Sequence, residues 1–305
     1  MPDVLTHILF ARKVKDTISD VFVKEAIEKN IQIYNFGAQG PDFLFYHASP
    51  LLVDNRVRSA GAMMHRIETA KFFKDYVLWL ENLNGEEYEQ ALAYFAGFLT
   101  HFYCDKTIHP YVEATREQGC GYFEKKQEKA HLSHYMIEYI MDIRLWKKYT
   151  DVDAYKQNIV ELIGEDPLPY EIVRYITEFI NFTQPNAISK KQVYNSSVLM
   201  KRIHKILFDP KNLKKWFINI LPLPRRCYVE KSKEDIDVLN LNRRKWHHVL
   251  NEEEISDSSV EDLLEIGSKE CSKCLNEIIE MLEKGIGKDL NTLIPDVGYM
   301  TNKPV

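Results

Sequence analysis

The sequence predicts an all-α protein, and three observations support that fold class. Apolar residues recur at intervals of three and four along most of the chain, as on the buried stripe of a helix. No array of alternating, strand-like segments and no internal repeat interrupts this pattern. At 305 residues with 45% hydrophobic content, the chain is also long enough to bury a substantial core.

The N-terminal part predicts short helices around one irregular loop. Residues 4–16 and 20–30 have helical periodicity, and Ser19 or Asp20 is a natural N-cap for the second of these helices. Residues 35–41 contain two glycines and a proline, so we expect a loop there that is followed by Asp42 and an apolar run. The next predicted helix covers residues 60–83 and carries His65 in its first turns.

The next two predicted helices carry most of the histidines that are close together. Residues 86–108 are apolar on two stripes, which indicates a central, buried helix. We expect this helix to end at His109, because a residue before proline is pushed out of the α region. A turn-rich connection should follow over residues 111–126, and then a long helix over residues 125–149.

The C-terminal half of the sequence is less informative. Residues 221–247 lack periodicity and predict a long connection. Ser258-x-x-Glu261 has the capping-box pattern, and a final amphipathic helix should follow it. We expect one continuous domain, with a metal-binding helical core in residues 1–150 and a helical C-terminal region, residues 151–305, packed on it. Further helices are expected over residues 153–163, 169–182, 190–208 and 210–220.

The net charge, the N-terminal residues and the cysteine content indicate which classes of protein are expected. A net charge of −5 gives no electrostatic footprint for nucleic acid, so no stable nucleic-acid partner is predicted, although Lys211–Lys215 is a local basic patch. The N-terminus shows neither a signal-peptide pattern nor an apolar run that predicts a transmembrane segment. Five scattered cysteines fit a reducing compartment, so we expect a cytoplasmic protein in which Cys271 and Cys274 are ordinary helix residues.

Histidines and carboxylates cluster at helical spacing. His101 and Asp105 lie four residues apart and so share one helix face, while His109, at the expected helix end, should point toward a second ion. Asp42 follows Gly40-Pro41 and precedes an apolar run, which is a poor place for a solvated charge. On the following predicted helix, four residues share one face: His131, His134, Glu138 and Asp142.

Imidazole and carboxylate donors without thiolate suit zinc, manganese or iron in a hydrolytic site. The set exceeds what one tetrahedral ion needs, so it predicts two or three ions with Asp105 bridging a pair. A buried ion pair would explain a single His-x-x-x-Asp, but two such helices together with Asp42 favour metal. The pattern matches neither a di-iron bundle nor the phosphohydrolases with adjacent His-Asp. Four other histidines are expected to be ordinary hydrogen-bonded residues: His47, His204, His247 and His248.

These segments resemble the zinc-dependent phospholipase C superfamily, which also includes secreted single-strand nucleases with a trinuclear zinc site. The similarity covers residues 2–146 and rests on five segments in the same order. It implies a large orthogonal helix bundle with a multinuclear zinc site. The segments are His7, Gly40-Pro41-Asp42, His65, GFLTHFYCDKTIHPY with His101, Asp105 and His109, and HYMIE with His134 and Glu138.

The resemblance also implies a ligand set for each ion. Asp42, His65, His101 and Asp105 would hold one zinc, and His109, His134 and Glu138 would hold a second. Asp105 and His7 would share a third. In the secreted relatives a processed N-terminal residue completes the third site; here Pro2 or Asp3 would take its place, or the site would be empty.

Several roles stay open at the level of sequence. His47 competes with His65 for the first ion, and we expect His65 because core residues flank it. His131 and Asp142 are additional candidate ligands. Glu128, Asp142 or backbone carbonyls are expected to orient the ligand imidazoles.

The functional hypothesis is metal-assisted hydrolysis of a phosphate ester. Two zincs would bind phosphate oxygens and lower the pKa of a bridging water, the third would stabilise the leaving oxygen, and Asp42 would orient or deprotonate the water. The resemblance implies a phosphodiester substrate, such as a phospholipid. A soluble nuclease or other phosphoesterase is the alternative, and a non-catalytic domain whose helices are held together by metal is a third reading.

Overall fold

The computed structural model describes residues 4–47, 54–66, 69–119, 122–123, 128–129, 132–184, 187–211, 213, 236–284, 290 and 293–304. Helices dominate these ranges, so the all-α prediction is confirmed. Two small antiparallel hairpins accompany them: β1 (Tyr122–Phe123) pairs with β2 (Glu128–Lys129), and β3 (Trp246–His248) pairs with β4 (Asn251–Ser256).

The helices of the described residues fall in the two halves of the chain. In the first half of the chain they are α1 (Val4–Lys15), α2 (Val21–Lys29), α3 (Ile31–Gly37), the 3-10 helix η1 (Gly40–Tyr46), α4 (Arg56–Met64), α5 (Thr69–Leu80) and α6 (Gly85–Gln118). In the second half they are α7 (His134–Thr150), the short 3-10 helix η3 (Ala154–Lys156), α8 (Ile159–Ile163), α9 (Tyr170–Thr183), α10 (Lys190–Leu207) and α12 (Val260–Lys284).

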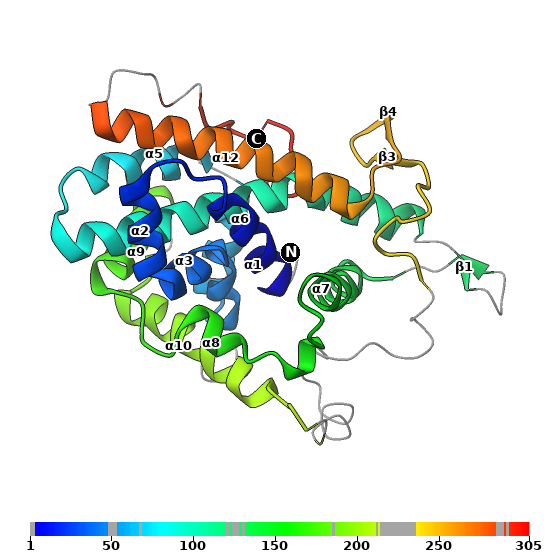
Figure 1. Ribbon diagram of the computed structural model, residues 1–305, viewed down its shortest axis with the longest axis horizontal. Helices are drawn as coiled ribbons and strands as arrows, with labels where there is room; N and C mark the ends of the chain where they lie inside the picture. Colours follow the sequence, from blue (N-terminus) through cyan, green and yellow to red (C-terminus); the bar gives the residue numbers. More distant parts are fainter. Residues whose placement is uncertain are drawn as a thin grey trace.

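Helix α6 is the central element. It packs against α3 and α12 most extensively and also contacts α1, α2, α5, α7 and α9. Figure 1 shows α6 lying across the molecule between α12 and α3, with α7 seen nearly end-on at one end. Elements from both halves of the chain therefore surround α6. The central, buried helix expected from the sequence is therefore confirmed.

The crossing of α3 and α6 depends on two glycines. A Cβ atom on Gly97 would lie 2.0 Å from the carbonyl oxygen of Tyr34, and one on Gly37 would lie 2.4 Å from that of Tyr94. The two main chains are therefore in direct contact, which only residues without a side chain permit. This contact fixes η1, which follows α3, against the turn of α6 that carries His101.

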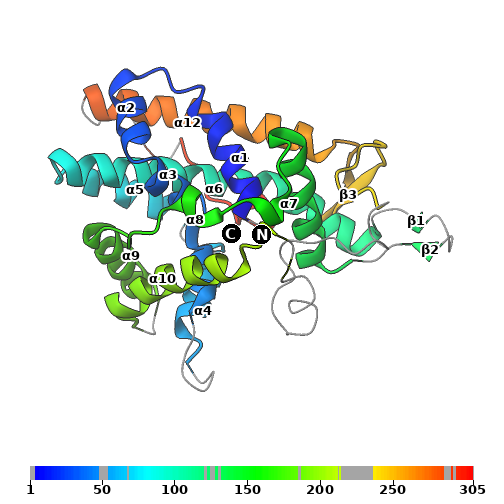
Figure 2. The same cartoon turned by 60° about the horizontal axis from the view of Figure 1, so that its bottom comes forward.

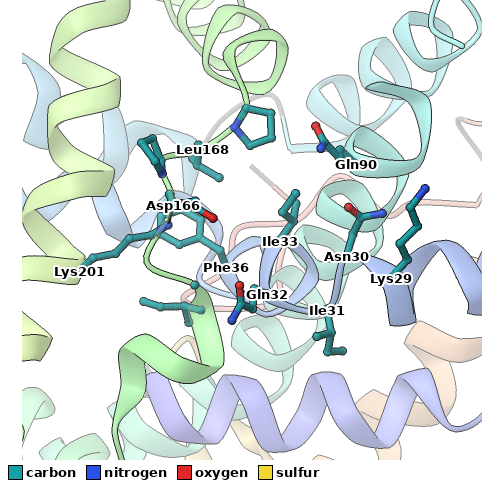
Figure 3. A pocket seen from close by; sticks show the side chains of 14 residues that line it. Lys29, Asn30, Ile31, Gln32, Ile33, Phe36, Gln90, Asp166, Leu168 and Lys201 are labelled. Atoms are coloured by element: carbon teal, nitrogen blue, oxygen red, sulfur yellow. Dashed lines mark hydrogen bonds between the residues drawn. The ribbon is translucent and has the colours of Figure 1, made fainter. Parts of the chain in front are cut away.

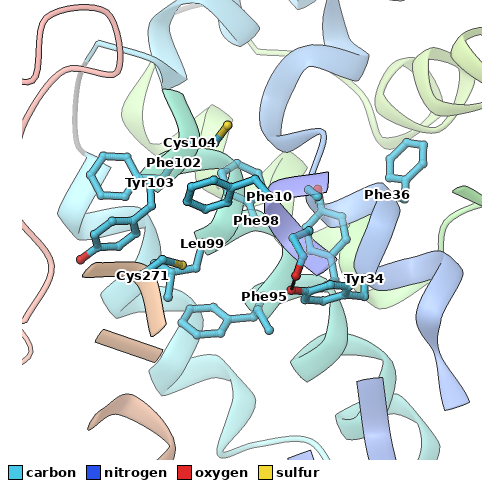
Figure 4. Packing of buried hydrophobic residues seen from close by; sticks show 14 of the residues in the cluster. Phe10, Tyr34, Phe36, Phe95, Phe98, Leu99, Phe102, Tyr103, Cys104 and Cys271 are labelled. Atoms are coloured by element: carbon cyan, nitrogen blue, oxygen red, sulfur yellow. Dashed lines mark hydrogen bonds between the residues drawn. The ribbon is translucent and has the colours of Figure 1, made fainter. Parts of the chain in front are cut away.

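Aromatic residues fill the interior on either side of this crossing. Figure 4 shows Phe10 of α1, Tyr34 of α3 and Phe95 of α6 among the side chains of one buried cluster. The Tyr34 hydroxyl donates a hydrogen bond of 2.7 Å to the carbonyl of Ala11. Buried hydroxyls need such a partner because an unpaired one loses its hydration without compensation. Cys271 and Cys274 are free and buried in α12, as the sequence predicts for ordinary helix residues.

The N-terminal elements differ from the sequence prediction in two places. Asp20 caps α2 by accepting from the main-chain N–H of Val23, as expected. The loop predicted over residues 35–41 is wrong in extent, because α3 continues to Gly37 and η1 begins at Gly40. The helix predicted over residues 60–83 is instead two helices, α4 and α5, and His65 is the C-cap of the first of them.

The predicted end of the central helix at His109 is also wrong. Helix α6 continues through Pro110 to Gln118. Proline removes one helical hydrogen bond, but the buried side chains beyond it, such as Tyr111 and Val112, hold the last turns in the core. Tyr111 donates to the carbonyl of Val238 at 2.9 Å, which ties this end to the C-terminal region. Tertiary packing thus overrides the local preference.

The helices predicted over residues 169–182 and 190–208 are present as α9 and α10, but α7 and α12 begin later than predicted. Ser133 caps α7, so this helix starts at His134 rather than near residue 125. The capping box of α12 lies one residue downstream of the predicted one: Ser259 and Asp262 hydrogen-bond each other's main-chain N–H groups. Most of the predicted helix 210–220 and the first part of the connection 221–247 lie outside the described residues, and β3 occupies the end of that connection. No helix in the described ranges is long and apolar enough to cross a membrane.

Candidate metal centre

Five side chains from four elements converge on one turn of α6. His7 comes from α1, Asp42 from η1, His65 from the end of α4, and His101 and Asp105 from α6. They form two overlapping groups of potential ligands whose donor atoms lie within 4.8 Å of one another: His7 with His101 and Asp105, and Asp42 with His65 and His101. We refer to these five residues as the main cluster.

Asp105 lies between the two groups, with its two carboxylate oxygens facing different histidines. Its Oδ1 is 3.3 Å from Nε2 of His7. Its Oδ2 is 3.3 Å from Nε2 of His101 and 3.8 Å from Nε2 of His65. Asp42 closes the other side, with Oδ1 at 3.1 Å from Nε2 of His65. A carboxylate with one oxygen toward each of two histidine groups has the arrangement that a bridging ligand requires.

Main-chain carbonyls fix the imidazoles of the main cluster. Nδ1 of His65 donates to the carbonyl of Gly61 at 2.7 Å, and Nδ1 of His101 donates to that of Ala38 at 3.3 Å. A carbonyl only accepts, so each neutral ring carries its proton on Nδ1 and presents the lone pair of Nε2 to the cluster. This is the arrangement that ligand histidines need, and backbone carbonyls were among the orienting groups that the sequence predicted.

Within the described part of the chain, the atoms that face one another in the main cluster make no hydrogen bond. They are Nε2 of His7, His65 and His101, Oδ1 of Asp42 and both carboxylate oxygens of Asp105. Each buried polar atom left unpaired costs about 1–3 kcal/mol. Divalent cations held between them would satisfy these atoms, so the donor set fits a metal such as zinc.

A second group lies one turn further along α6. His109 Nε2 is 3.2 Å from Oε1 of Glu138, and His134 Nε2 is 2.7 Å from the same oxygen. These three residues again bring potential ligand atoms within 4.8 Å of one another. His109 is also 3.8 Å from Asp105, measured from Nδ1 to Oδ2, so the second group adjoins the main cluster. Nε2 of His109 therefore faces Glu138 whereas Nε2 of His101 faces Asp105, and the second ion at His109 stays a prediction.

The outer partners of the second group come from two distant segments. Nδ1 of His134 lies 2.6 Å from Oε1 of Glu113, whose other oxygen lies 2.7 Å from Arg116. Nδ1 of His109 donates to the carbonyl of Tyr299 at 3.1 Å. The sequence did not single out Glu113 or Tyr299. Glu113 lies four residues after His109, a spacing that places it on the same side of a helix once α6 is known to continue past Pro110.

The comparison with protein families identifies the lineage of this site. The model of a family described as zinc dependent phospholipase C matches residues 6–190, which is more than half of the chain and includes every residue of both groups. The chain belongs to the zinc-dependent phospholipase C family. Comparison with curated proteins and with solved structures found no match. The family and the clusters together support a zinc phosphoesterase, which is a hydrolase of phosphate esters.

Electrostatics favour the protonation states that a zinc ligand needs at Asp105 and His101, but not at Asp42. Burial opposes the charge on Asp105, but the adjacent His109 and His101 outweigh burial and hold the pKa of Asp105 well below its usual value. Burial lowers the pKa of His101, so its imidazole is neutral near pH 7. Burial raises the pKa of Asp42 and so disfavours its charged form. Metal binds deprotonated carboxylates and neutral imidazoles, so a cation would stabilise the charge that burial disfavours.

Two other sequence-predicted candidates have hydrogen-bonding roles. His47 contacts the hydroxyl of Ser196 through Nδ1 at 3.3 Å, and it belongs to neither group. Asp142 accepts the main-chain N–H groups of Leu5 and Thr6, so it caps the first turn of α1 from a neighbouring helix. Asp142 thereby holds the helix that carries His7.

The remaining histidines bear out the expectation of ordinary hydrogen bonding. His204 contacts the hydroxyl of Tyr46, His247 contacts the carbonyl of Glu252, and His248 contacts that of Thr301. Three predictions cannot be compared with the structure because they fall outside the described residues or side chains: His131, Glu128 and the N-terminal residues Met1–Asp3.

The structure also contains a separate pocket of about 260 Å³ between α3, α10 and the segment that joins α8 to α9. Figure 3 shows Lys201, Phe36 and Gln32 among the side chains around it. None of its lining residues is a candidate metal ligand. The pocket therefore belongs to a different region of the fold from the metal centre.

Proposed function

We propose that this chain is a zinc-dependent phosphoesterase that hydrolyses a phosphodiester, with Asp42 acting on the attacking water. The observation that carries the proposal is the convergence of unpaired, buried nitrogen and oxygen atoms on Asp105. Zinc suits this set because imidazole and carboxylate are its usual ligands in catalytic sites. The family match supports both the metal and the class of bond that is cleaved.

The proposed ligands divide between two or three ions. Asp42, His65, His101 and Asp105 would hold one zinc. His109, His134 and Glu138 would hold a second, and His7 with Asp105 would contribute to a third. Bound zinc supplies Lewis acidity toward phosphoryl oxygens and lowers the pKa of water.

Asp42 is the member of the main cluster best placed to act on water. Its side chain is 14% exposed, whereas those of His65, His101 and Asp105 are at most 4% exposed. It therefore lies at the outward edge of the cluster, where a phosphate ester would approach. Its carboxylate would orient the attacking water and accept a proton from it. Oδ1 of Asp42 lies 3.1 Å from Nε2 of His65, so both atoms would face the same ion.

A panel of substrates tests the reaction class. Zinc-loaded protein should release the headgroup from phosphatidylcholine vesicles or cleave bis-p-nitrophenyl phosphate, and single-stranded DNA distinguishes a nuclease from a lipase. Asp42→Asn should lower kcat by about 100-fold or more, the usual contribution of a positioned base. Asp54→Asn is the matched control, because Asp54 pairs with Arg56 away from the cluster. Zinc binding without hydrolysis of any of these substrates would instead favour a non-catalytic domain.

A further inference from the structure

Tyr299 connects the two ligand groups although it lies beyond the region that the family model matches. It belongs to the segment after α12, and it is 1% exposed. Its main-chain N–H donates to the carbonyl of His65 at 3.0 Å, and its carbonyl accepts from Nδ1 of His109 at 3.1 Å. One residue therefore contacts a histidine of the main cluster and a histidine of the second group. In Figure 2 the red C-terminal segment passes across α6.

The side chain of Tyr299 packs on the same histidines. The centroid of its ring lies 4.9 Å from that of His65, edge to face, and 5.7 Å from that of His101. A third contact, with Phe102 at 5.0 Å, joins it to the core of α6. Such edge-to-face and tilted aromatic contacts stabilise the packing beyond the area that they bury. The ring therefore fixes the main chain of Tyr299 where its two hydrogen bonds are made.

The flanking residues hold this segment in place. Val297 forms an isolated antiparallel bridge with Pro304. Nε2 of His248, in β3, donates to the carbonyl of Thr301 at 2.9 Å, and Asp296 accepts from the main chain of Ala70 at 3.2 Å. Anchors on both sides of Tyr299 leave little freedom for its carbonyl to move away from His109.

We propose that Tyr299 is a positioning residue of the metal centre, which sets the orientation of His109 and His65 through its main chain. The inference rests on the proposed zinc function. The Nδ1–H of His109 needs an acceptor, because the tautomer protonated at Nδ1 is the one that leaves Nε2 free for a metal. Folding of the C-terminal segment and zinc binding should then be coupled, and each should stabilise the other.

The test compares zinc dissociation constants, measured by competition with a chelator, in full-length variants whose helix content is checked by circular dichroism. Tyr299→Ala removes the ring that anchors the main chain, and Tyr299→Phe keeps that ring. Tyr76→Ala is the matched control, because Tyr76 is equally buried but its hydroxyl and ring contact α5, α6 and α9 residues away from the ligands. Tyr299→Leu, which fills more of the space, decides the question if the alanine variant does not fold.

We expect zinc to bind about 10- to 100-fold more weakly to Tyr299→Ala, the usual loss when an outer partner of a ligand is released. Tyr299→Phe and Tyr76→Ala should bind zinc as the unmodified chain does. Unchanged affinity in folded Tyr299→Ala or Tyr299→Leu overturns the inference and leaves the proposed function standing, and so does an equal loss in Tyr76→Ala. If the unmodified chain itself binds no zinc, both the proposed function and the inference fail.

Discussion

Replacing Gly40 by alanine should damage the metal centre through the ring of His101. Gly40 has φ of +50°, and a Cβ atom built there would lie 2.0 Å from Cδ2 and 2.4 Å from Cγ of His101. The left-handed backbone alone costs a residue with a side chain about 1–2 kcal/mol. Forcing the ring or η1 to move adds the cost of overpacking, about 1–3 kcal/mol. Gly40→Ala should therefore lose about 2–5 kcal/mol of unfolding free energy.

Gly85 provides a matched control for the backbone contribution. It has φ of +56°, and a Cβ atom there would meet nothing within 4 Å. Gly85→Ala should therefore lose only the backbone cost of about 1–2 kcal/mol. The difference between the two variants isolates the displacement of the His101 ring.

Two assays separate stability from metal binding. Urea unfolding in the presence of a chelator gives the free energy of unfolding of each variant, and chelator competition gives its zinc affinity. Zinc should bind at least about tenfold more weakly to Gly40→Ala, since its His101 ligand is displaced, and normally to Gly85→Ala. Equal zinc affinity in the two variants would refute the assignment of His101 as a ligand in this geometry.

Three further changes have expected outcomes. Glu113→Gln weakens the partner of His134, so zinc at the second group should bind about 10- to 100-fold more weakly in a chelator titration, whereas replacing the exposed Glu117 should have no effect. Gly97→Ala should lower the free energy of unfolding by about 3 kcal/mol or more in a urea titration, because its Cβ would lie 2.0 Å from a main-chain oxygen of α3. An unchanged midpoint would contradict the direct contact between the main chains of α3 and α6. Burial lowers the pKa of Lys201 from 10.5 to about 8. Between pH 8 and pH 10.5 the unfolded chain therefore binds more protons than the folded chain, and the free energy of unfolding should rise with pH by about 3 kcal/mol. Lys201→Met should abolish that rise, as measured by unfolding curves at pH 8 and above. A rise of the same size in the variant would exclude Lys201 as its source.

Local sequence patterns were sufficient to predict the parts of the site that lie on a single helix or turn. The interval of four between His101, Asp105 and His109 predicts side chains on neighbouring turns of one helix, and α6 has this arrangement. The turn before Asp42 predicts a carboxylate that is not a solvated surface charge, and the side chain of Asp42, in the first turn of η1, is only 14% exposed. These inferences need only helix geometry and turn preferences.

The features that sequence reasoning missed depend on contacts between distant segments. Pro110 argues locally for a helix end, and only the burial of Tyr111 beyond it explains why α6 continues. Glu113 becomes recognisable as a partner of His134 once that continuation is known. Tyr299 lies 190 residues from His109, and its role is carried by main-chain groups that every residue type possesses. No residue pattern could have identified it.

The most direct test of the central claim is an anomalous-scattering map at the zinc absorption edge, recorded from crystals of protein purified with zinc. The account predicts one peak between Asp42, His65, His101 and Asp105 and another between His109, His134 and Glu138. A third peak beside His7 and Asp105 would show that the third ion is bound as well. Zinc-saturated crystals without a peak beside Asp105 would contradict the account, because the unpaired atoms around that carboxylate would then have another explanation.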